Sequence, residues 1–239
     1  MTRRGVVLGG GGVAGIAWET GLLVGLAEAG VELLGAGLFV GTSAGSTVAA
    51  QITSGLSLPE LFQRQVDPAL QVPELPAVPD EEAMAALFGD AWEAAEGPLD
   101  LRRRIGELAL AAPTVSEAER RAVIAARLPR HTWPEVDLKI VAVDAETGEE
   151  RVFDRASGVG LVEAVAASCA VPGTWPPVTI AGRRYIDGGV RSGENADLAT
   201  GCDQCHRRAG DGRAGQHGSR RSGGGPARTG RAGDRHPAR

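Results

Sequence analysis

The apolar residues of this chain fall into short continuous runs and longer stretches of helical spacing. Continuous runs at residues 5–8 and 38–40 are typical of buried strands, and the stretch between them, residues 16–29, has helical spacing and ends at Gly30. Strand, helix and strand in this order predict parallel strands that are joined by a right-handed crossover.

The same patterns predict the rest of the folded part. Proline-rich sequence at residues 59–79 indicates a loop or a lid. Further helices are expected at 81–96, 99–111, 116–128 and 161–170, and hairpins at 138–143 with 150–153 and at 178–180 with 184–186. Ser116 and Glu119 have the spacing of a capping box.

The pattern of apolar residues stops abruptly near the carboxyl end. No Val, Ile, Leu, Met, Phe, Trp or Tyr follows Leu198, so we expect a folded domain over residues 1–202 and a disordered basic tail over 203–239. The tail has the composition of GC-rich codons read in a wrong frame, which suggests a frameshift near Cys202 or Asp203. A natural disordered tail is the alternative.

Composition and charge narrow the class of protein. The 239 residues are 43% hydrophobic, which suits one globular domain, and no apolar run is long enough to span a membrane. Residues 1–202 hold 16 of the 25 Lys and Arg but 27 of the 30 Asp and Glu, and an acidic body argues against a nucleic-acid partner. Three cysteines give no disulfide framework, and glycines 9–12 would break a secretory signal helix. We therefore expect a cytoplasmic protein.

The pentapeptide Gly41-Thr42-Ser43-Ala44-Gly45, directly after the second apolar run, matches the G-x-S-x-G pattern of a nucleophile elbow. In such an elbow a sharp strand-to-helix turn exposes the serine hydroxyl, and Gly41 and Gly45 leave room for the backbone. The other interpretation is a strand-turn-helix junction without chemistry.

The glycine run that follows the first strand has two functional interpretations. Gly10, Gly12 and Gly15 satisfy the dinucleotide pattern G-x-G-x-x-G, but that site needs an acidic residue at the end of the second strand, and Glu32 precedes this strand. Alternatively, the amides of Gly10, Gly11 and Gly12 form an oxyanion hole. We favour the oxyanion hole over the nucleotide site, and either over a purely structural turn.

A serine nucleophile needs a base. Asp187, which ends a strand and is followed by Gly188 and Gly189, is the strongest candidate, and its alternative role is that of a turn residue. His131 lies in a loop-like stretch typical of the surface, and a triad with His206 is disfavoured because His206 lies in the tail. The C-x-x-C-H match at residues 202–206 is attributed to chance, so no cofactor and no metal are expected.

The glycine run, the Ser43 pentapeptide and the Asp187-Gly188-Gly189 motif together resemble the patatin-like phospholipase family in order and spacing, over residues 5 to about 202. This resemblance implies an α/β fold with a central, mostly parallel sheet flanked by helices. It also implies a Ser43–Asp187 dyad, an oxyanion hole at residues 10–12, and a lipid or other acyl ester as substrate, with peripheral membrane contact.

The chain departs from the family pattern in two places. Ala14 stands where the glycine motif usually has Arg or Lys, which would alter the binding of anionic head groups or the position of the loop. Family members also continue beyond residue 203 with an apolar strand and further helix, so the domain is expected to be truncated there. Loss of a core strand would cost several kcal/mol of stability. Besides an active hydrolase and a nucleotide-binding module, the third hypothesis is therefore an inactive relic of the hydrolase.

Overall fold

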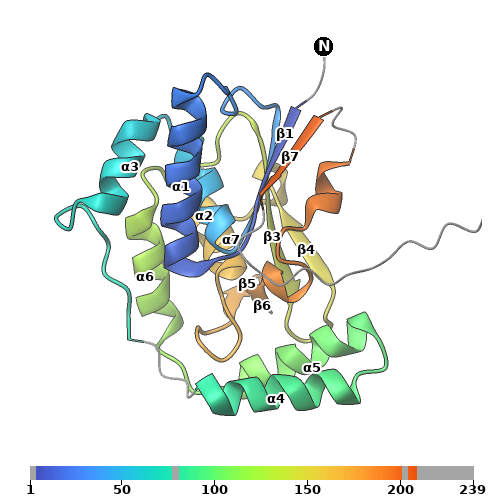
Figure 1. The fold of residues 1–239 in the computed structure, drawn as a ribbon. Coiled ribbons are helices and arrows are strands. Elements are labelled where there is room, and N and C mark those ends of the chain that lie inside the picture. Colours follow the sequence, from blue (N-terminus) through green and yellow to red (C-terminus); the bar gives the residue numbers. More distant parts are fainter. Residues whose placement is uncertain (1–3, 77–80, 201–203, 209–239) are drawn as a thin grey trace, which may run out of the picture.

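The computed structural model describes residues 4–76, 81–200 and 204–208, which form a mixed sheet with helices around it (Figure 1). The sheet has seven strands. Six of them are hydrogen-bonded to one another in the order β5-β6-β3-β2-β1-β7, and β4 also pairs with β3. The strands are β1 (Arg4–Leu8), β2 (Leu38–Thr42), β3 (Asp137–Asp144), β4 (Glu150–Phe153), β5 (Val178–Ile180), β6 (Arg183–Asp187) and β7 (Gln204–Arg208).

Strands β1, β2, β3 and β7 are parallel, and the two predicted hairpins, β3–β4 and β5–β6, are antiparallel. β6 also pairs antiparallel with β3. The predicted fold class, an α/β fold with a mostly parallel central sheet flanked by helices, is therefore confirmed.

Both faces of the sheet are buried, as expected for parallel strands. On one face Val6, Leu8 and Phe39 pack in a large core cluster against the helices that follow β1 and β2. On the other face Val7 and Val40 contact the short helical turn η3 (Ala196–Ala199). The remaining helices are α1 (Gly12–Glu28), α2 (Ala44–Ile52), α3 (Leu58–Val66), α4 (Glu81–Ala94), α5 (Pro98–Ala111), α6 (Glu117–Arg127) and α7 (Leu161–Ser168), with 3-10 turns η1 (Arg155–Ser157) and η2 (Gly188–Val190).

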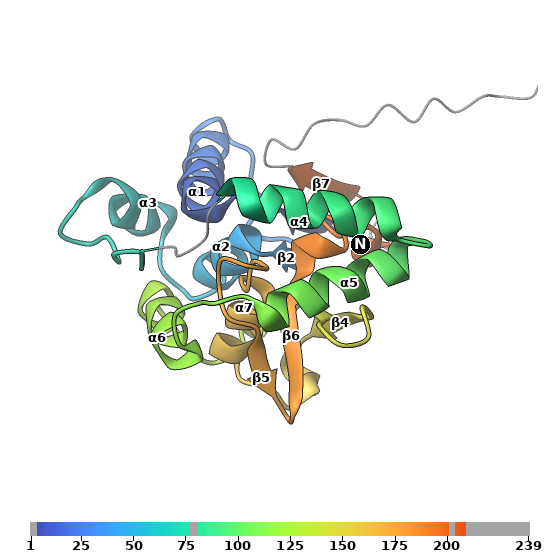
Figure 2. The ribbon, with the colours of Figure 1, turned by 90° about the horizontal axis from the view of Figure 1, so that it is seen from below.

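Helices α4 and α5 lie across the end of the sheet at which β1 and β2 finish (Figures 1 and 2). Helix α5 approaches the β3–β4 connection closely, because a Cβ atom on Gly106 would lie 1.9 Å from the carbonyl oxygen of Ala145. The described helices include none that is both long enough and apolar enough to cross a bilayer.

Two of the predicted elements differ in the structure. Helix α1 begins at Gly12 rather than near residue 16, so its first turn includes part of the glycine run. The predicted loop at 59–79 is wrong in its first part, where α3 spans Leu58–Val66. Ser57 and Glu60 form a capping box there, and a proline in the first turn of a helix costs no hydrogen bond.

The predicted disordered tail over 203–239 also differs from the structure at residues 204–208, which form β7 beside β1. The pairing runs from Arg4 opposite Gln204 to Leu8 opposite Arg208. Backbone hydrogen bonds to an open sheet edge require no apolar side chain, so apolar composition alone did not reveal this strand. Residues 209–239 lie outside the described part of the chain.

Candidate active site

Ser43 sits at a sharp turn between β2 and α2. Its φ of 53° and ψ of −118° lie outside the usual regions for a non-glycine residue. The flanking glycines leave the room that this turn needs, because a Cβ atom on Gly41 would lie 2.6 Å from the Cα of Ser46 and one on Gly45 only 2.2 Å from the Leu8 carbonyl oxygen. The sequence around Ser43 thus folds as a strained strand-to-helix turn.

The sheet register brings Asp187 to this turn. β4 pairs with residues 140–143 of β3 and occupies one edge of that strand. β2 pairs with residues 137–141 and β6 with 142–144, and both ranges overlap that of β4. β2 and β6 therefore both lie on the opposite edge of β3, one after the other. On that edge Thr42 lies opposite Val141 and Asp187 lies opposite the next residue, Ala142. The two strands run toward each other and end at adjacent positions, one with Ser43 and the other with Asp187.

The Asp187 carboxylate is buried beside the Ser43 hydroxyl. Asp187 is 4% exposed and Ser43 8% exposed, and the amide of Gly189 donates a hydrogen bond of 2.7 Å to Oδ1 of Asp187. Burial raises the pKa of Asp187 to about 6, although its interactions with the Ser43 hydroxyl and the Gly189 amide lower it. The carboxylate is therefore mostly ionised at neutral pH and has a greater proton affinity than an ordinary aspartate.

Side chains far along the sequence hold the turn in place. The Ser43 amide donates to the hydroxyl of Ser168 (3.0 Å), and the thiol of Cys169 donates to the Ser43 carbonyl oxygen (3.2 Å). The side-chain amide of Asn195 donates to Oγ1 of Thr42 (3.0 Å) and to the carbonyl oxygen of Gly188 (3.2 Å). The strands that carry Ser43 and Asp187 are thus tied together by one buried amide.

The glycine loop between β1 and α1 lies against the Ser43 turn. A Cβ atom on Gly10 would lie 3.8 Å from the Cβ of Ser43. The Gly10 amide donates to the carbonyl oxygen of Gly193 (2.9 Å), so it is already occupied. Within the described residues the amides of Gly11 and Gly12 have no hydrogen-bond acceptor, and they lie at the start of α1, where the helix dipole is positive.

A cavity of about 370 Å³ adjoins this loop. Val13 and Ala14, which directly follow Gly12, form part of its wall. The other lining residues are Ile16, Ala17, Gln51, Arg64, Gln65, Leu70, Gln71, Val72 and Arg127, so the cavity is partly apolar and partly cationic.

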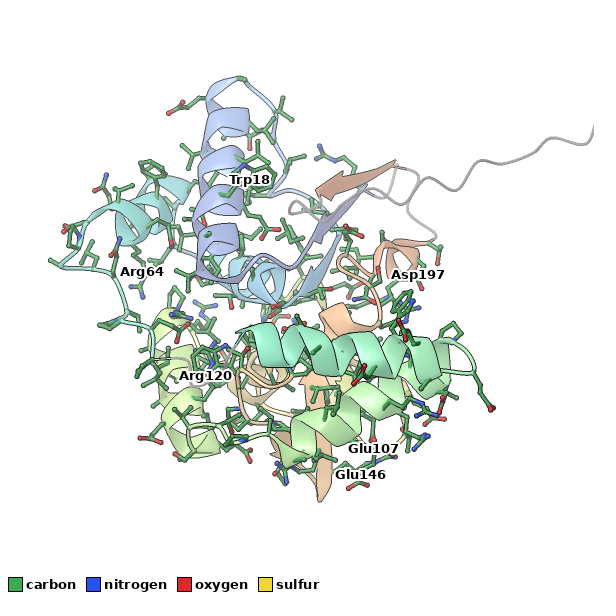
Figure 3. The ribbon with its side chains drawn as sticks, turned by 60° about the horizontal axis from the view of Figure 1, so that its bottom comes forward. Trp18, Arg64, Glu107, Arg120, Glu146 and Asp197 are labelled. Carbon is green, nitrogen blue, oxygen red and sulfur yellow. The ribbon has the colours of Figure 1, made fainter. Side chains whose placement is uncertain are left out.

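An ion-pair cluster fixes the segment that follows α3. The Glu74 carboxylate bridges two buried arginines of α6: it pairs with Nη1 of Arg120 and lies 3.0 Å from Nη2 of Arg127. The Arg120 guanidinium also stacks on the ring of Trp175 at 3.9 Å. Arg120 and Arg64 both lie on the side of the molecule formed by α3 and α6 (Figure 3).

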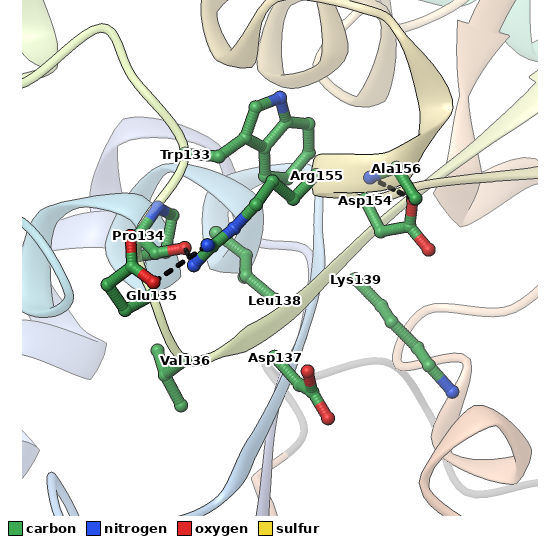
Figure 4. Close-up of a pocket in the computed structure, with 10 residues that line it drawn as sticks. All are labelled: Trp133, Pro134, Glu135, Val136, Asp137, Leu138, Lys139, Asp154, Arg155 and Ala156. Atoms are coloured by element: carbon green, nitrogen blue, oxygen red, sulfur yellow. Dashed lines mark hydrogen bonds and ion pairs between the residues drawn. The ribbon is translucent and has the colours of Figure 1, made fainter.

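A second cavity, of about 490 Å³, lies at the other end of β3 (Figure 4). It is lined by residues 133–139 and 154–156, and Arg155 pairs there with Glu135 at 2.8 Å. Asp137 lies opposite Leu38, the first residue of β2, so this cavity faces the end of the sheet away from Ser43. None of the candidate site residues lines it.

The remaining candidates are placed away from Ser43. Glu32 is exposed and precedes β2, so it lies at the opposite end of that strand from the glycine loop. His131 is exposed and its Nε2 lies 2.9 Å from the Ala125 carbonyl oxygen, in agreement with its predicted surface position. His206 is in β7, opposite Val6 in the middle of β1.

Sequence reasoning missed the residues whose hydrogen bonds hold the site, namely Glu19, Ser168, Cys169, Gly193 and Asn195. A signal existed for Glu19, an acidic residue three positions after Ile16 and four before Leu23, which places it on the apolar face of α1. Asn195 and Gly193 carry no such signal, because they lie in an irregular segment.

Two solved structures are among those to which this chain is similar. The crystal structure of VipD from Legionella pneumophila matches with a TM-score of 0.45 and 16% identity, over 80% of this chain and 46% of that one. The crystal structure of the type III effector protein ExoU matches with a TM-score of 0.36 and 22% identity, over 75% of this chain and 42% of that one. This chain therefore spans less than half the length of either protein. No curated protein matches it.

The comparison with family models covers most of the folded part. The model of the patatin-like phospholipases matches residues 6–200, a range that begins within β1 and ends just after η3. It includes the glycine loop, the Ser43 turn and Asp187. The chain belongs to the patatin-like phospholipase family.

Proposed function

We propose that this protein is a lipid acyl hydrolase that cleaves carboxylic esters, with Ser43 as nucleophile and Asp187 as general base. The observation that carries the proposal is that the strained Ser43 turn and the buried Asp187 lie at adjacent positions along β3. A serine hydroxyl becomes a useful nucleophile when an adjacent base removes its proton.

In the first half of the reaction, Oγ of Ser43 attacks the ester carbonyl carbon while its proton moves to Asp187. The C–O bond to the alcohol then breaks, and the proton on Asp187 passes to the departing alkoxide. The product is an acyl ester of Ser43. In the second half, Asp187 removes a proton from water, the hydroxide attacks the acyl carbon, and Ser43 leaves with that proton as the acid is released.

The negative charge on the tetrahedral intermediate needs hydrogen-bond donors. The unoccupied amides of Gly11 and Gly12, at the positive end of α1, suit this role. The Gly10 amide is held by Gly193, so we assign Gly10 to the shape of the loop and not to the oxyanion hole. Gly15 permits the close packing of α1 on α2, since its Cβ would lie 3.2 Å from that of Ala44.

The cavity beside Val13 and Ala14 is the proposed site for part of the lipid. Its wall is partly apolar, and Val13 in that wall directly follows the glycines whose amides would bind the oxyanion. Arg64 and Arg127 also line it, so the anionic groups of a lipid would meet positive charge there even though Ala14 itself has none.

A nucleotide-binding module is less well supported. A dinucleotide site requires a carboxylate at the end of β2 for the ribose, but β2 leads directly into Ser43, and Glu32 lies at its other end. Titration with NAD or NADP would detect such a site.

The proposal is tested with a fluorophosphonate probe, which labels activated serines, followed by mass mapping of the labelled peptide. We expect labelling of Ser43 in the wild type, and loss of both labelling and p-nitrophenyl ester hydrolysis in Ser43→Ala and Asp187→Asn. Ser57→Ala, which removes only the cap of α3, is the matched control and should keep both activities. A cooperatively folded wild type that neither labels nor hydrolyses would refute the proposal in favour of an inactive relic.

A further inference from the structure

The buried acid Glu19 forms a hydrogen bond with the start of the glycine loop. Glu19 lies on α1, is 2% exposed, and its Oε1 accepts a hydrogen bond of 2.9 Å from the amide of Gly9. The remaining walls around it are apolar: Val6 and Leu8 of β1, Leu22, Leu23 and Leu26 of α1, and Leu33. The cavity between these side chains is only about 10 Å³, which is too tight to hydrate a charge.

An acid in such surroundings is costly. Burial raises the pKa of Glu19 to about 8, with the Gly9 amide as the opposing influence, so the side chain is protonated at neutral pH. Its Oε2 has no hydrogen-bond partner within the described residues. A methionine or leucine would fill the same space without burying a carboxyl group, so packing does not explain an acid here. The hydrogen bond to Gly9 is what an apolar side chain could not provide.

Gly9 connects that hydrogen bond to the Ser43 turn. Its carbonyl oxygen accepts from the amide of Gly45, in the first turn of α2 (2.8 Å), and the next residue, Gly10, donates to Gly193 beyond Asp187. The loop is therefore held by α1, by the helix that follows Ser43, and by the segment that follows Asp187. A shift of Gly9 would move the amides of Gly11 and Gly12 relative to Ser43.

We propose that Glu19 is a positioning residue that fixes the glycine loop, and with it the oxyanion donors, against Ser43. The inference rests on the proposed function for its effect on catalysis, but the Glu19–Gly9 contact can be tested without activity.

Two substitutions separate positioning from packing. Glu19→Gln keeps an acceptor for Gly9 and should leave kcat within about threefold of the wild type. Glu19→Met fills the space without an acceptor. It should still fold cooperatively but lose about 10- to 100-fold in kcat with little change in KM, because a misplaced donor acts mainly on the transition state. Leu23→Ala, in the same cavity, is the packing control and should lower stability without lowering kcat.

The activity-independent measurement is the amide resonance of Gly9 in a pH titration followed by NMR. In the wild type we expect it to shift with a midpoint near pH 8, and in Glu19→Gln to stay constant over that range. A stable Glu19→Met with wild-type kcat, or a Gly9 resonance that does not titrate in the wild type, would overturn the inference. Loss of all hydrolysis and labelling in the wild type would instead count against the proposed function and leave the titration as the test of Glu19.

Discussion

Asp187→Asn should abolish ester hydrolysis and at the same time make the folded protein more stable at neutral pH. Folding raises the pKa of this carboxyl from 3.8 to about 6, mainly by burial. Since the folded state favours the protonated form, the stability that Asp187 contributes is complete below about pH 4 and is lost as pH rises through 6. Two pKa units correspond to about 3 kcal/mol, and asparagine, which carries no charge, avoids this loss.

Urea unfolding followed by tryptophan fluorescence would measure the effect, since the chain has four tryptophans. We expect the free energy of unfolding of Asp187→Asn to exceed that of the wild type by about 3 kcal/mol at pH 7 and to differ little from it near pH 3.5. A stability difference that is the same at both pH values would mean that it comes from packing or hydrogen bonding. A variant less stable than the wild type at pH 7 would show that the buried charge is not costly, and would refute the reasoning.

Three further predictions concern the pH profile, the elbow and the ion-pair cluster. In stopped assays, kcat/KM should rise with pH to a plateau with an apparent pKa near 6, because Asp187 must be ionised to act as a base; a rate independent of pH down to 5 would exclude it. In thermal melts, Gly45→Ala should lower the free energy of unfolding by about 1–3 kcal/mol or more, because its Cβ clashes with Leu8. Gly25→Ala, whose Cβ meets no atom within 4 Å, should raise it by up to about 1 kcal/mol. Similar effects for both would contradict the close approach at the elbow. In urea unfolding, Glu74→Gln should lower the free energy of unfolding by about 3 kcal/mol, because two buried arginines lose their shared carboxylate. An unchanged unfolding midpoint would show that the arginines do not depend on this carboxylate.

Much of the fold could be predicted from the sequence because the local signals agree with the tertiary structure. Apolar runs marked β1 and β2, and the turns around Gly148 and Gly182, both in the left-handed region, marked the two hairpins. Where signals compete, prediction failed: proline-rich composition concealed α3, although the capping box of Ser57 and Glu60 marks the start of this helix.

The candidate site could be predicted only as far as its motifs reach. The motifs at Ser43 and Asp187, and the family that they resemble, indicated the two residues as partners. Their placement at adjacent positions along β3 depends on a register that no local pattern encodes. The same limit applies to the loop amides. Whether Gly10 or Gly11 is free depends on the carbonyl of Gly193, which approaches only when the chain is folded.

The hydrogen bond from the Ser43 amide to Ser168 spans 125 residues, and Asp187 follows later still. As the chain leaves the ribosome, the serine therefore emerges well before the groups that would activate and orient it. A nascent or prematurely terminated chain that contains the elbow but not β6 would lack Asp187, so the proposed reaction could not begin during translation. Reactivity would begin only when the last strands close around β3.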